Sequence, residues 1–281
     1  EELAAQACRG EPLKALQKMY HITNEERTEI IRPNAENGQE PVGSMGDDTP
    51  MAVLSQQIRH VGDFFRQQFA QVTNPPIDPL RESIVMSLQT CLGAETNVFA
   101  PSARDAHRII LSSPVLSASK MQQLETLADP AFQMARIDLN YDANLELSAA
   151  IKAICEQVAN SIRAGHTLIV LSDKNITADK VPANAIMVTG AVHHYLIAQG
   201  IRTDANLIIE TGLARDSHQV AVLIGFGATC VYPYLAYDVI DDLVGTGELL
   251  GDPIQARVNF RKGLDKGLLK LLSKMGISAI V

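Results

Sequence analysis

The residues best suited to chemistry follow two predicted strands, each at its carboxyl end. Asp173 comes directly after an apolar run, and Glu210 closes the next run, with Arg215 and His218 a few positions further on. Carboxylates beside an arginine and a histidine can transfer protons or bind a small anion. Barrel enzymes keep such groups at the carboxyl ends of their strands. One interpretation is therefore an acid–base cluster of Asp173, Glu210, Arg215 and His218.

A structural interpretation explains the same residues. Asp173 and Asp216 can cap helices, and Arg215 can pair with a carboxylate. Ion networks of this kind are common at strand ends and need no substrate. The sequence leaves both interpretations open, and the structural one is the commoner outcome.

Two polar loops, residues 43–51 and 71–79, run directly into predicted helices. Thr49 and Asp78 are good N-caps, and the proline after each suits the first helical position. Apolar residues then recur at helical spacing: Met51, Leu54, Ile58 and Val61 after the first loop, and Leu80, Ile84, Val85 and Leu88 after the second. Two helix N-termini close together would direct unpaired N–H groups into a shared polar space. Such loops are also ordinary turns and caps.

No metal or dinucleotide site is expected. Asp47 and Asp48 are adjacent carboxylates, but no further ligand follows at a suitable spacing. His193 and His194 point about 100° apart on a helix, so they cannot chelate one ion together. The glycines around Phe226 lack the third glycine of a dinucleotide fingerprint and precede their strand. The four cysteines (Cys8, Cys91, Cys155 and Cys230) are far apart, which predicts reduced thiols and a cytoplasmic location.

Composition excludes some partners. The 281-residue chain has a formal net charge of −8, which disfavours binding to nucleic acid or to an acidic membrane surface. Residues 219–237 carry no Asp, Glu, Lys or Arg, but Gly225, Gly227 and Pro233 interrupt them. We interpret this run as a buried helix end followed by a buried strand.

From residue 133 onwards, predicted strands and helices alternate. The strands are 134–139, 167–171, 207–210 and 228–232, and the helices are 145–163, 183–199, 218–225, 234–245 and 253–274. Short apolar strands separated by helices require parallel pairing, either covered on both faces or closed into a barrel. The fold class is therefore α/β, and residues 277–281 read as the beginning of one more strand.

The first 132 residues have a different pattern. Two short helices are expected in residues 1–32, and a polar linker over 32–38. The two loop–helix units extend to about Leu92, and Gly93 would end the last helix. A hairpin over 97–113 follows, with strands at 98–99 and 109–111, and then a helix over 119–127. The expected division is a helical lead-in (1–38), a loop–helix and hairpin half (39–132), an alternating half (133–276) and a last strand.

Several linked motifs resemble the central domain of the glutamate synthase large chain. They are residues 40–50, 69–82, 169–173, 190–194, 200–203, 225–228 and 232–236, all in the family's order. The resemblance implies a single α/β domain, 1–281, similar to an incomplete form of the flavin-binding β/α barrel that follows it. Residues 274–278 look like the opening of that barrel, so 277–281 would begin the flavin domain.

The resemblance also implies partners. An N-terminal glutaminase domain of the same chain releases ammonia, and a C-terminal FMN domain adds it to 2-oxoglutarate and reduces the product to glutamate. The parent enzyme holds FMN and a 3Fe-4S cluster, and neither is expected in this segment. Whether NADPH or ferredoxin supplies the electrons stays open.

By resemblance, the two loops meet the neighbouring domains and line the ammonia tunnel. The residues expected there are Ser44, Met45, Gly46, Thr49, Thr73, Asn74 and Pro75. Hydroxyl and amide groups can pass a small neutral amine along a water-excluding wall, and methionine can form a flexible constriction. The segment would then catalyse nothing by itself.

This chain departs from the family's pattern at two places on the rim that the carboxyl ends of the predicted strands form. After Asp216 the chain has Ser217 and then His218, where the family pattern has two histidines, and Lys174 and Asn175 replace an Arg-Gly turn. The alternative function is a self-contained β/α-barrel enzyme that acts on a small anion at this rim. A third, an interaction module, is compatible with the scaffold and predicts exposed apolar patches.

Overall fold

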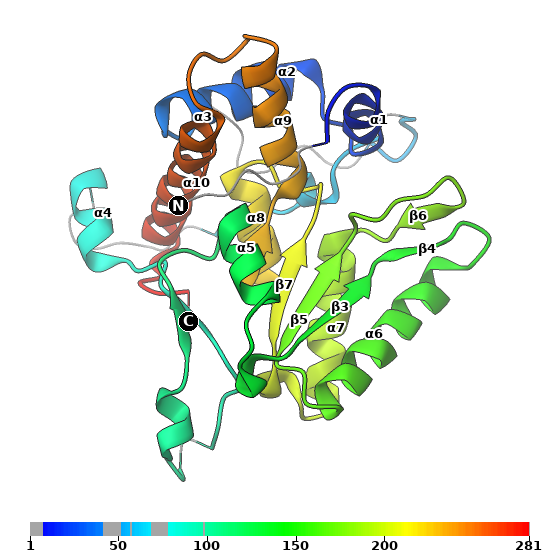
Figure 1. The fold of residues 1–281 in the computed structure, drawn as a ribbon, viewed down its shortest axis with the longest axis vertical. Helices are drawn as coiled ribbons and strands as arrows, with labels where there is room; N and C mark the ends of the chain where they lie inside the picture. The colour runs from blue at the N-terminus through cyan, green and yellow to red at the C-terminus, as the bar shows by residue number, and fades with distance from the viewer. Residues whose placement is uncertain (1–7, 42–51, 57, 69–77, 98, 281) are drawn as a thin grey trace.

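The computed structural model describes residues 8–41, 52–56, 58–68, 78–97 and 99–280. Its centre is a four-stranded parallel sheet in the order β3-β5-β7-β8 (Figure 1). The strands are β3 (Met134–Asp138), β5 (Leu168–Ser172), β7 (Asn206–Glu210) and β8 (Cys230–Tyr232). The sheet order equals the chain order, as in a β/α barrel. Val115 adds a single parallel bridge to Val231 beyond β8.

Helices follow each strand of this sheet. They are α6 (Leu147–Arg163), α7 (Ala185–Ala198), α8 (Ser217–Gly225), α9 (Tyr234–Gly245) and α10 (Pro253–Met275). The helices α6 and α7 pack on each other and on the strands, while α10 packs on α3, α8 and α9. All five residues of β5 are buried, as expected for a parallel strand covered on both faces. The predicted α/β fold, an incomplete β/α-barrel-like sheet flanked by helices, is confirmed.

The N-terminal part is helical, as predicted. It contains α1 (Glu11–Met19), α2 (Asn24–Glu26), a π-helical turn (Arg27–Ile31) and α3 (Arg32–Asn37). The predicted polar linker at 32–38 is wrong, because the helix continues to Asn37 and ends at Gly38, whose φ is 58°. Proline clashes with the carbonyl four residues earlier in a regular helix, and the wider π turn directly before Pro33 is where such a clash can be relieved.

Residues 52–132 contain most of the differences from the sequence predictions. The helix predicted after Thr49 is absent from 52–60 in the part that the structure describes, and only a 3₁₀ turn, Val61–Phe64, follows. The second predicted helix exists as α4 (Pro79–Val85), and the Asp78 side chain accepts hydrogen bonds from Leu80 N and Arg81 N. It ends before Leu88, because the chain becomes extended there.

The hairpin has a different first strand from the predicted one. β1 (Thr90–Leu92) pairs antiparallel with β2 (Ile109–Leu111). Gly93 therefore follows a strand, with φ 136°, and does not end a helix. Phe99, predicted to lie in a strand, is 92% exposed. Leu92 is fully buried, so burial of Leu92 rather than Phe99 selects the pairing.

The remaining elements are short. α5 (Ala118–Glu125) matches its prediction, and an antiparallel pair, β4 (Asn140–Asp142) with β6 (Lys180–Pro182), was not expected. Near the end of the chain, Ala279 forms one parallel bridge to Ser87 instead of the expected strand. The run 219–237 divides into the end of α8, β8 and the start of α9. None of the helices in the described ranges is long and apolar enough to cross a membrane.

Candidate functional site

Asp173 lies at the carboxyl end of β5 and is fully buried. Its carboxylate accepts hydrogen bonds from the Thr211 hydroxyl and from Gly212 N at 3.0 Å, while its backbone carbonyl accepts from the Tyr20 hydroxyl at 3.1 Å. Asp173 therefore does not cap a helix. It holds the turn that follows β7 and the end of α1 against the sheet.

Gly212 is part of the same arrangement. A Cβ atom there would lie 2.7 Å from the Tyr20 ring, so glycine is what allows this ring to pack over the turn. Burial raises the pKa of Asp173 to about 6, against the opposing effect of its hydrogen bonds. Burial also raises the pKa values of Tyr20 and Tyr234, so both hydroxyls stay protonated beside this carboxylate.

Glu210, at the end of β7, is also buried. Its carboxylate accepts hydrogen bonds from the Ser172 hydroxyl and from Arg136, and Lys174 Nζ lies 3.9 Å away. Arg136 also pairs with Glu125 of α5. A buried carboxylate is costly unless it is paired and hydrogen-bonded, and Glu210 is both.

Arg215 turns away from these carboxylates. Its guanidinium donates to Glu26 at 2.8 Å and to the carbonyls of Tyr20 and His21 at 3.3 and 3.4 Å. The partner that the sequence predicted for Arg215 is thus a carboxylate 189 residues earlier in the chain. Arg215 fixes the α1–α2 connection to the loop after β7.

His218, in the first turn of α8, binds a different segment from those that Glu210 and Arg215 contact. Its Nε2 donates to the carbonyl of Gly62 at 2.8 Å. The neighbouring Asp216 is the N-cap of α8 and accepts from Gln219 N at 2.7 Å, as predicted. The structure therefore joins Asp173 to Glu210 through the backbone, where Asp173 N donates to Glu210 O at 3.1 Å, and gives the two carboxylates different partners. It directs Arg215 and His218 to other segments.

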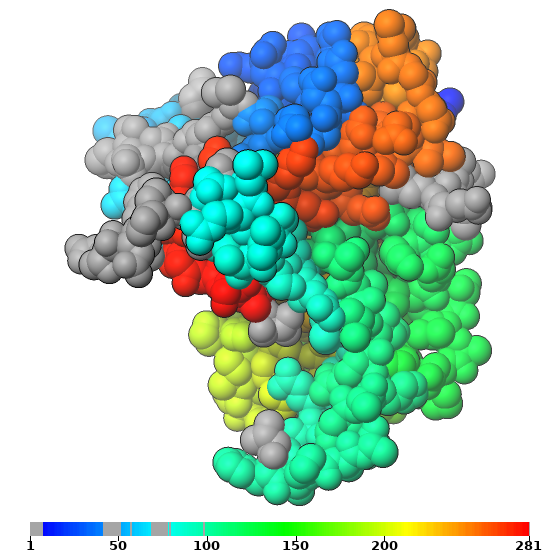
Figure 2. Space-filling model, turned by 90° about the vertical axis from the view of Figure 1, so that its left-hand side faces the viewer, coloured from blue at the N-terminus to red at the C-terminus, as the bar shows by residue number. Residues whose placement is uncertain are grey.

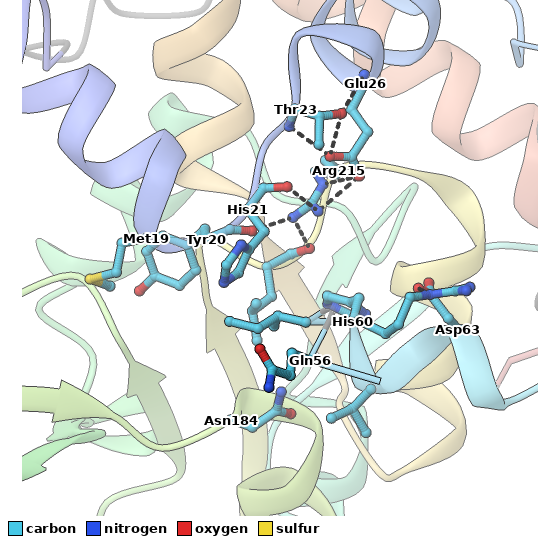
Figure 3. Close-up of a pocket in the computed structure, with 14 residues that line it drawn as sticks. Met19, Tyr20, His21, Thr23, Glu26, Gln56, His60, Asp63, Asn184 and Arg215 are labelled. Carbon is cyan, nitrogen blue, oxygen red and sulfur yellow. Dashed lines mark hydrogen bonds and ion pairs between the residues drawn. The ribbon is translucent and has the colours of Figure 1, made fainter. Parts of the chain in front are cut away.

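A cavity of about 590 Å³ lies over the carboxyl ends of the strands, between the α1–α2 connection, residues 56, 58–61 and 63, and the start of α7 (Figure 3). Of the four clustered residues only Arg215 lines the wall of this cavity within the described ranges, and its charge is paired there with Glu26. His60 also lines it, and its Nδ1 accepts from Gly62 N at 2.9 Å. Burial and the nearby Arg215 lower the pKa of His60 to about 4, so the ring is neutral at neutral pH.

A family model described as "Glutamate synthase central domain" matches residues 15–281. The chain belongs to the glutamate synthase central domain family. It is 38% identical to the NADPH glutamate synthase large chain of Bacillus subtilis (strain 168) over 94% of this chain. It is 40% identical to the ferredoxin-dependent glutamate synthase of Antithamnion sp. over 93%, and 38% identical to the NADH enzyme of Schizosaccharomyces pombe over 93%.

This central domain spans only 13–18% of the length of these relatives. Their names include three electron donors, so the family match does not choose between NADPH and ferredoxin. Similarity to solved structures is weak: a flavocytochrome b2 variant superposes with a TM-score of 0.39 and 13% identity over 60% of this chain.

The loop residues expected at the tunnel lie outside the described residues. This applies to Ser44, Met45, Gly46 and Thr49 of the first loop, and to Thr73, Asn74 and Pro75 of the second. Their place in the central domain stays a prediction. The described residues next to the loops are Glu40, which pairs with Lys270 of α10, and Asp78, the cap of α4.

No group of three or more His, Cys, Asp or Glu side chains suited to a metal occurs in the described ranges. The two adjacent histidines differ in their surroundings. His194 is exposed, whereas His193 is half-buried and accepts from Arg202 Nε at 3.0 Å. Gly227 follows α8 with φ 108°, which agrees with a helix stop.

Sequence reasoning missed the partners of the strand-end residues. Tyr20, Glu26, His60 and Arg136 come from segments far away in the chain, and no motif marks them. Tyr234 could have been identified from the sequence, because it lies in the motif 232–236 that carries the family resemblance. Its hydroxyl donates to that of Tyr20 at 3.4 Å.

Proposed function

We propose that this chain is the central scaffold of a glutamate synthase. It would link a glutaminase domain to an FMN domain in one polypeptide and line part of the tunnel that carries ammonia between them. Family membership and the small share of the relatives' length that the chain covers support this proposal. The free cysteines agree with a cytoplasmic location but do not establish one.

The observation that best supports the scaffold role is that the strand-end side chains form hydrogen bonds within the chain. Asp173, Glu210 and His218 each face a hydrogen-bond partner inside the chain, and Arg215 faces Glu26. A general acid or base must reach a substrate proton within hydrogen-bond distance. Arg215 and His218 join Glu26 of α2 and Gly62 to the segment after β7, while Asp173 and Glu210 hold the ends of neighbouring strands together. Such contacts suit a rigid support.

The strand-end chemistry also disfavours FMN in this segment. A flavin phosphate is an anion and is normally bound by backbone N–H groups and cations at the top of a barrel. The described strand ends present the buried carboxylates of Asp173 and Glu210 there, and the two cations next to Glu210, Arg136 and Lys174, pair with it. FMN and the 3Fe-4S cluster belong, in this proposal, to other parts of the parent enzyme.

The two loops would supply the polar wall of the tunnel. Ammonia must stay neutral and out of bulk water, so hydroxyl and amide groups suit its passage better than charged ones. Ser44, Thr49, Thr73 and Asn74 offer such groups, and Met45 offers a flexible constriction. The rigid domain would hold both loops in register with the neighbouring active sites.

The test is the stoichiometry of the full-length enzyme. Coupled turnover forms two glutamate molecules for each glutamine hydrolysed, whereas a blocked tunnel leaves one glutamate and free ammonia. Met45→Trp and Thr73→Val should lower the ratio towards one while glutamine hydrolysis continues. Ser55→Thr, outside the two loops, is the matched control and should keep the coupled ratio. If the ratio stayed at two in both loop variants, the result would contradict the proposal that these loops line the tunnel.

A further inference from the structure

The helix α4 leaves its apolar side chains exposed. Leu80 and Ile84, four residues apart and so on one face, are 85% and 81% exposed. Glu82, on another face, lies within electrostatic range of Lys270 and Lys274 of α10. Surface helices normally place the apolar stripe against the core and the charges outward. The helix α4 departs from this rule, because its apolar side chains are exposed together with Arg81 and Ser83.

Along this part of the chain, the exposure of apolar side chains ends with α4, because the apolar residues directly after it are buried. Met86 and Leu88 are both 7% exposed and are anchored in the domain. The Asp78 cap and the hydrogen bond from Met86 N to Glu82 O define both ends of the helix. The apolar stripe therefore stays outside although the chain on its carboxyl side is fixed.

The end of the chain lies directly beside α4. Ser87 N donates to Ser278 O at 2.8 Å, and Ser87 forms a parallel bridge with Ala279. Two more exposed apolar side chains, Met275 and Ile277, lie on this terminal segment, at 37% and 38% exposure. Figure 1 shows α4 projecting from the body of the domain, and Figure 2 shows it next to the end of α10. Polypeptide that continues past residue 281 would begin at this surface.

We infer that the apolar stripe of α4 (Leu80, Ile84 and Val85) is the docking surface for the polypeptide that follows residue 281 in the full-length chain. This inference rests on the proposed function, because it requires the longer parent protein. The curated relatives are several times longer than this chain, so a following segment has the length to cover the stripe. Its contact face must be apolar, since two i, i+4 aliphatic side chains offer no hydrogen bonds.

The stripe differs from isolated exposed apolar residues elsewhere. Leu250 is 90% exposed, but it is a single side chain in the connection between α9 and α10. Single exposed apolar residues are normal on protein surfaces and need no partner. Leu250 therefore serves as a matched control of equal exposure and similar chemistry.

Thiol labelling of the full-length protein tests whether the stripe is covered. Ile84→Cys and, separately, Leu80→Cys and Leu250→Cys are labelled in the native state, and the modified peptides are quantified by mass spectrometry. Docking predicts labelling at positions 84 and 80 at least about tenfold slower than at 250. Equal rates at all three positions would overturn the inference.

Photo-crosslinking identifies the occupant. With p-benzoylphenylalanine in place of Ile84, the expected product has the mass of one chain and joins α4 to a peptide beyond residue 281. Crosslinks to a second copy, to residues preceding this segment, or to no peptide despite slow labelling would each overturn the assignment. The readout does not involve ammonia transfer, so failure of the tunnel variants would leave this result standing.

Discussion

Residues 133–276 and residues 52–85 both carry apolar stripes in the sequence, but among the described residues the first region buries most of its stripes and the second leaves large apolar side chains exposed. In β5, Leu168, Ile169, Val170 and Leu171 are completely buried. In the second region Leu54 is 95% exposed, and the α4 stripe is exposed as described above. An amphipathic pattern thus indicates that a face will be covered, but not which polypeptide covers it.

The contrast assigns different tasks to the two regions. Under the proposed function, the alternating half, which carries its own core, is the rigid body, and neighbouring domains complete the region that contains the two loops. Alanine and charge-removal variants can measure this difference, because the same kind of change should have unequal effects in the two regions.

The largest effect is expected at the buried ion pair of the rigid half. Asp241 of α9 and Arg257 of α10 are both 3% exposed and pair through two hydrogen bonds. Asp241→Ala removes one partner of a buried ion pair, which should cost about 3–5 kcal/mol of unfolding free energy. Chemical denaturation of the 281-residue chain measures this loss.

Glu248→Ala is the control for that prediction. Glu248 pairs with Arg27 at 2.8 Å, but its side chain is 43% exposed. Exposed ion pairs contribute about 0–1 kcal/mol, so the variant should unfold almost as the parent does. Comparable losses in the two variants would mean that α9 and α10 are not part of a rigid core.

Leu171→Ala against Ile84→Ala compares the two regions directly. Leu171 is fully buried in the sheet, and its truncation should cost about 2–5 kcal/mol. Ile84 is exposed in this chain, so truncation there should cost about 0.5 kcal/mol or less. The denaturation midpoints of both variants measure these two costs. A large loss of unfolding free energy in Ile84→Ala would mean that α4 already has its partner within this chain.

A smaller effect is expected in the pH dependence. The pKa of Asp173 is raised from 3.8 to about 6, so the folded state binds this proton more tightly than the unfolded state does. Stability should therefore fall as the pH rises from about 4 to about 6, by up to about 1.4 kcal/mol per pH unit from this group. Asp238 and Asp265 shift in the same direction and add to the slope.

Asp173→Asn isolates the contribution of that residue. The variant should lose stability less steeply between about pH 4 and about pH 6 than the parent, whatever its stability at one pH. The slope of unfolding free energy against pH is the readout. Identical slopes would show that Asp173 titrates as an exposed carboxyl and that the strand-end contacts are looser than described.

The sequence predicted the rigid half well for a physical reason. The strands of the parallel sheet, β3, β5, β7 and β8, are short and mostly apolar, and helix stops or caps such as Gly165 and Asp216 lie between them, so local signals and global packing agree. The strand-end contacts could not be predicted in this way. Arg215 with Glu26 and Asp173 with Tyr20 join residues more than 150 positions apart, and no local pattern encodes such a pairing.

The errors lie where local and tertiary preferences disagree. Pro33 reads as a helix breaker, yet the π turn before it keeps the helix intact. Thr90 to Leu92 reads as the end of a helix, but burial of Leu92 in the hairpin makes it a strand. The predicted helix after Thr49 is absent from residues 52–60 as far as the structure describes them, and Leu54 there is exposed.

The most direct test of the central claim is an assay of the purified 281-residue chain itself. The sample must first show cooperative thermal unfolding. It is then assayed for glutaminase activity, for glutamate formation from ammonia and 2-oxoglutarate, and for flavin absorbance. A rigid scaffold predicts a folded, colourless protein with neither activity. Turnover of either substrate, or flavin that copurifies with the chain, would contradict the account and make the strand-end cluster an active site.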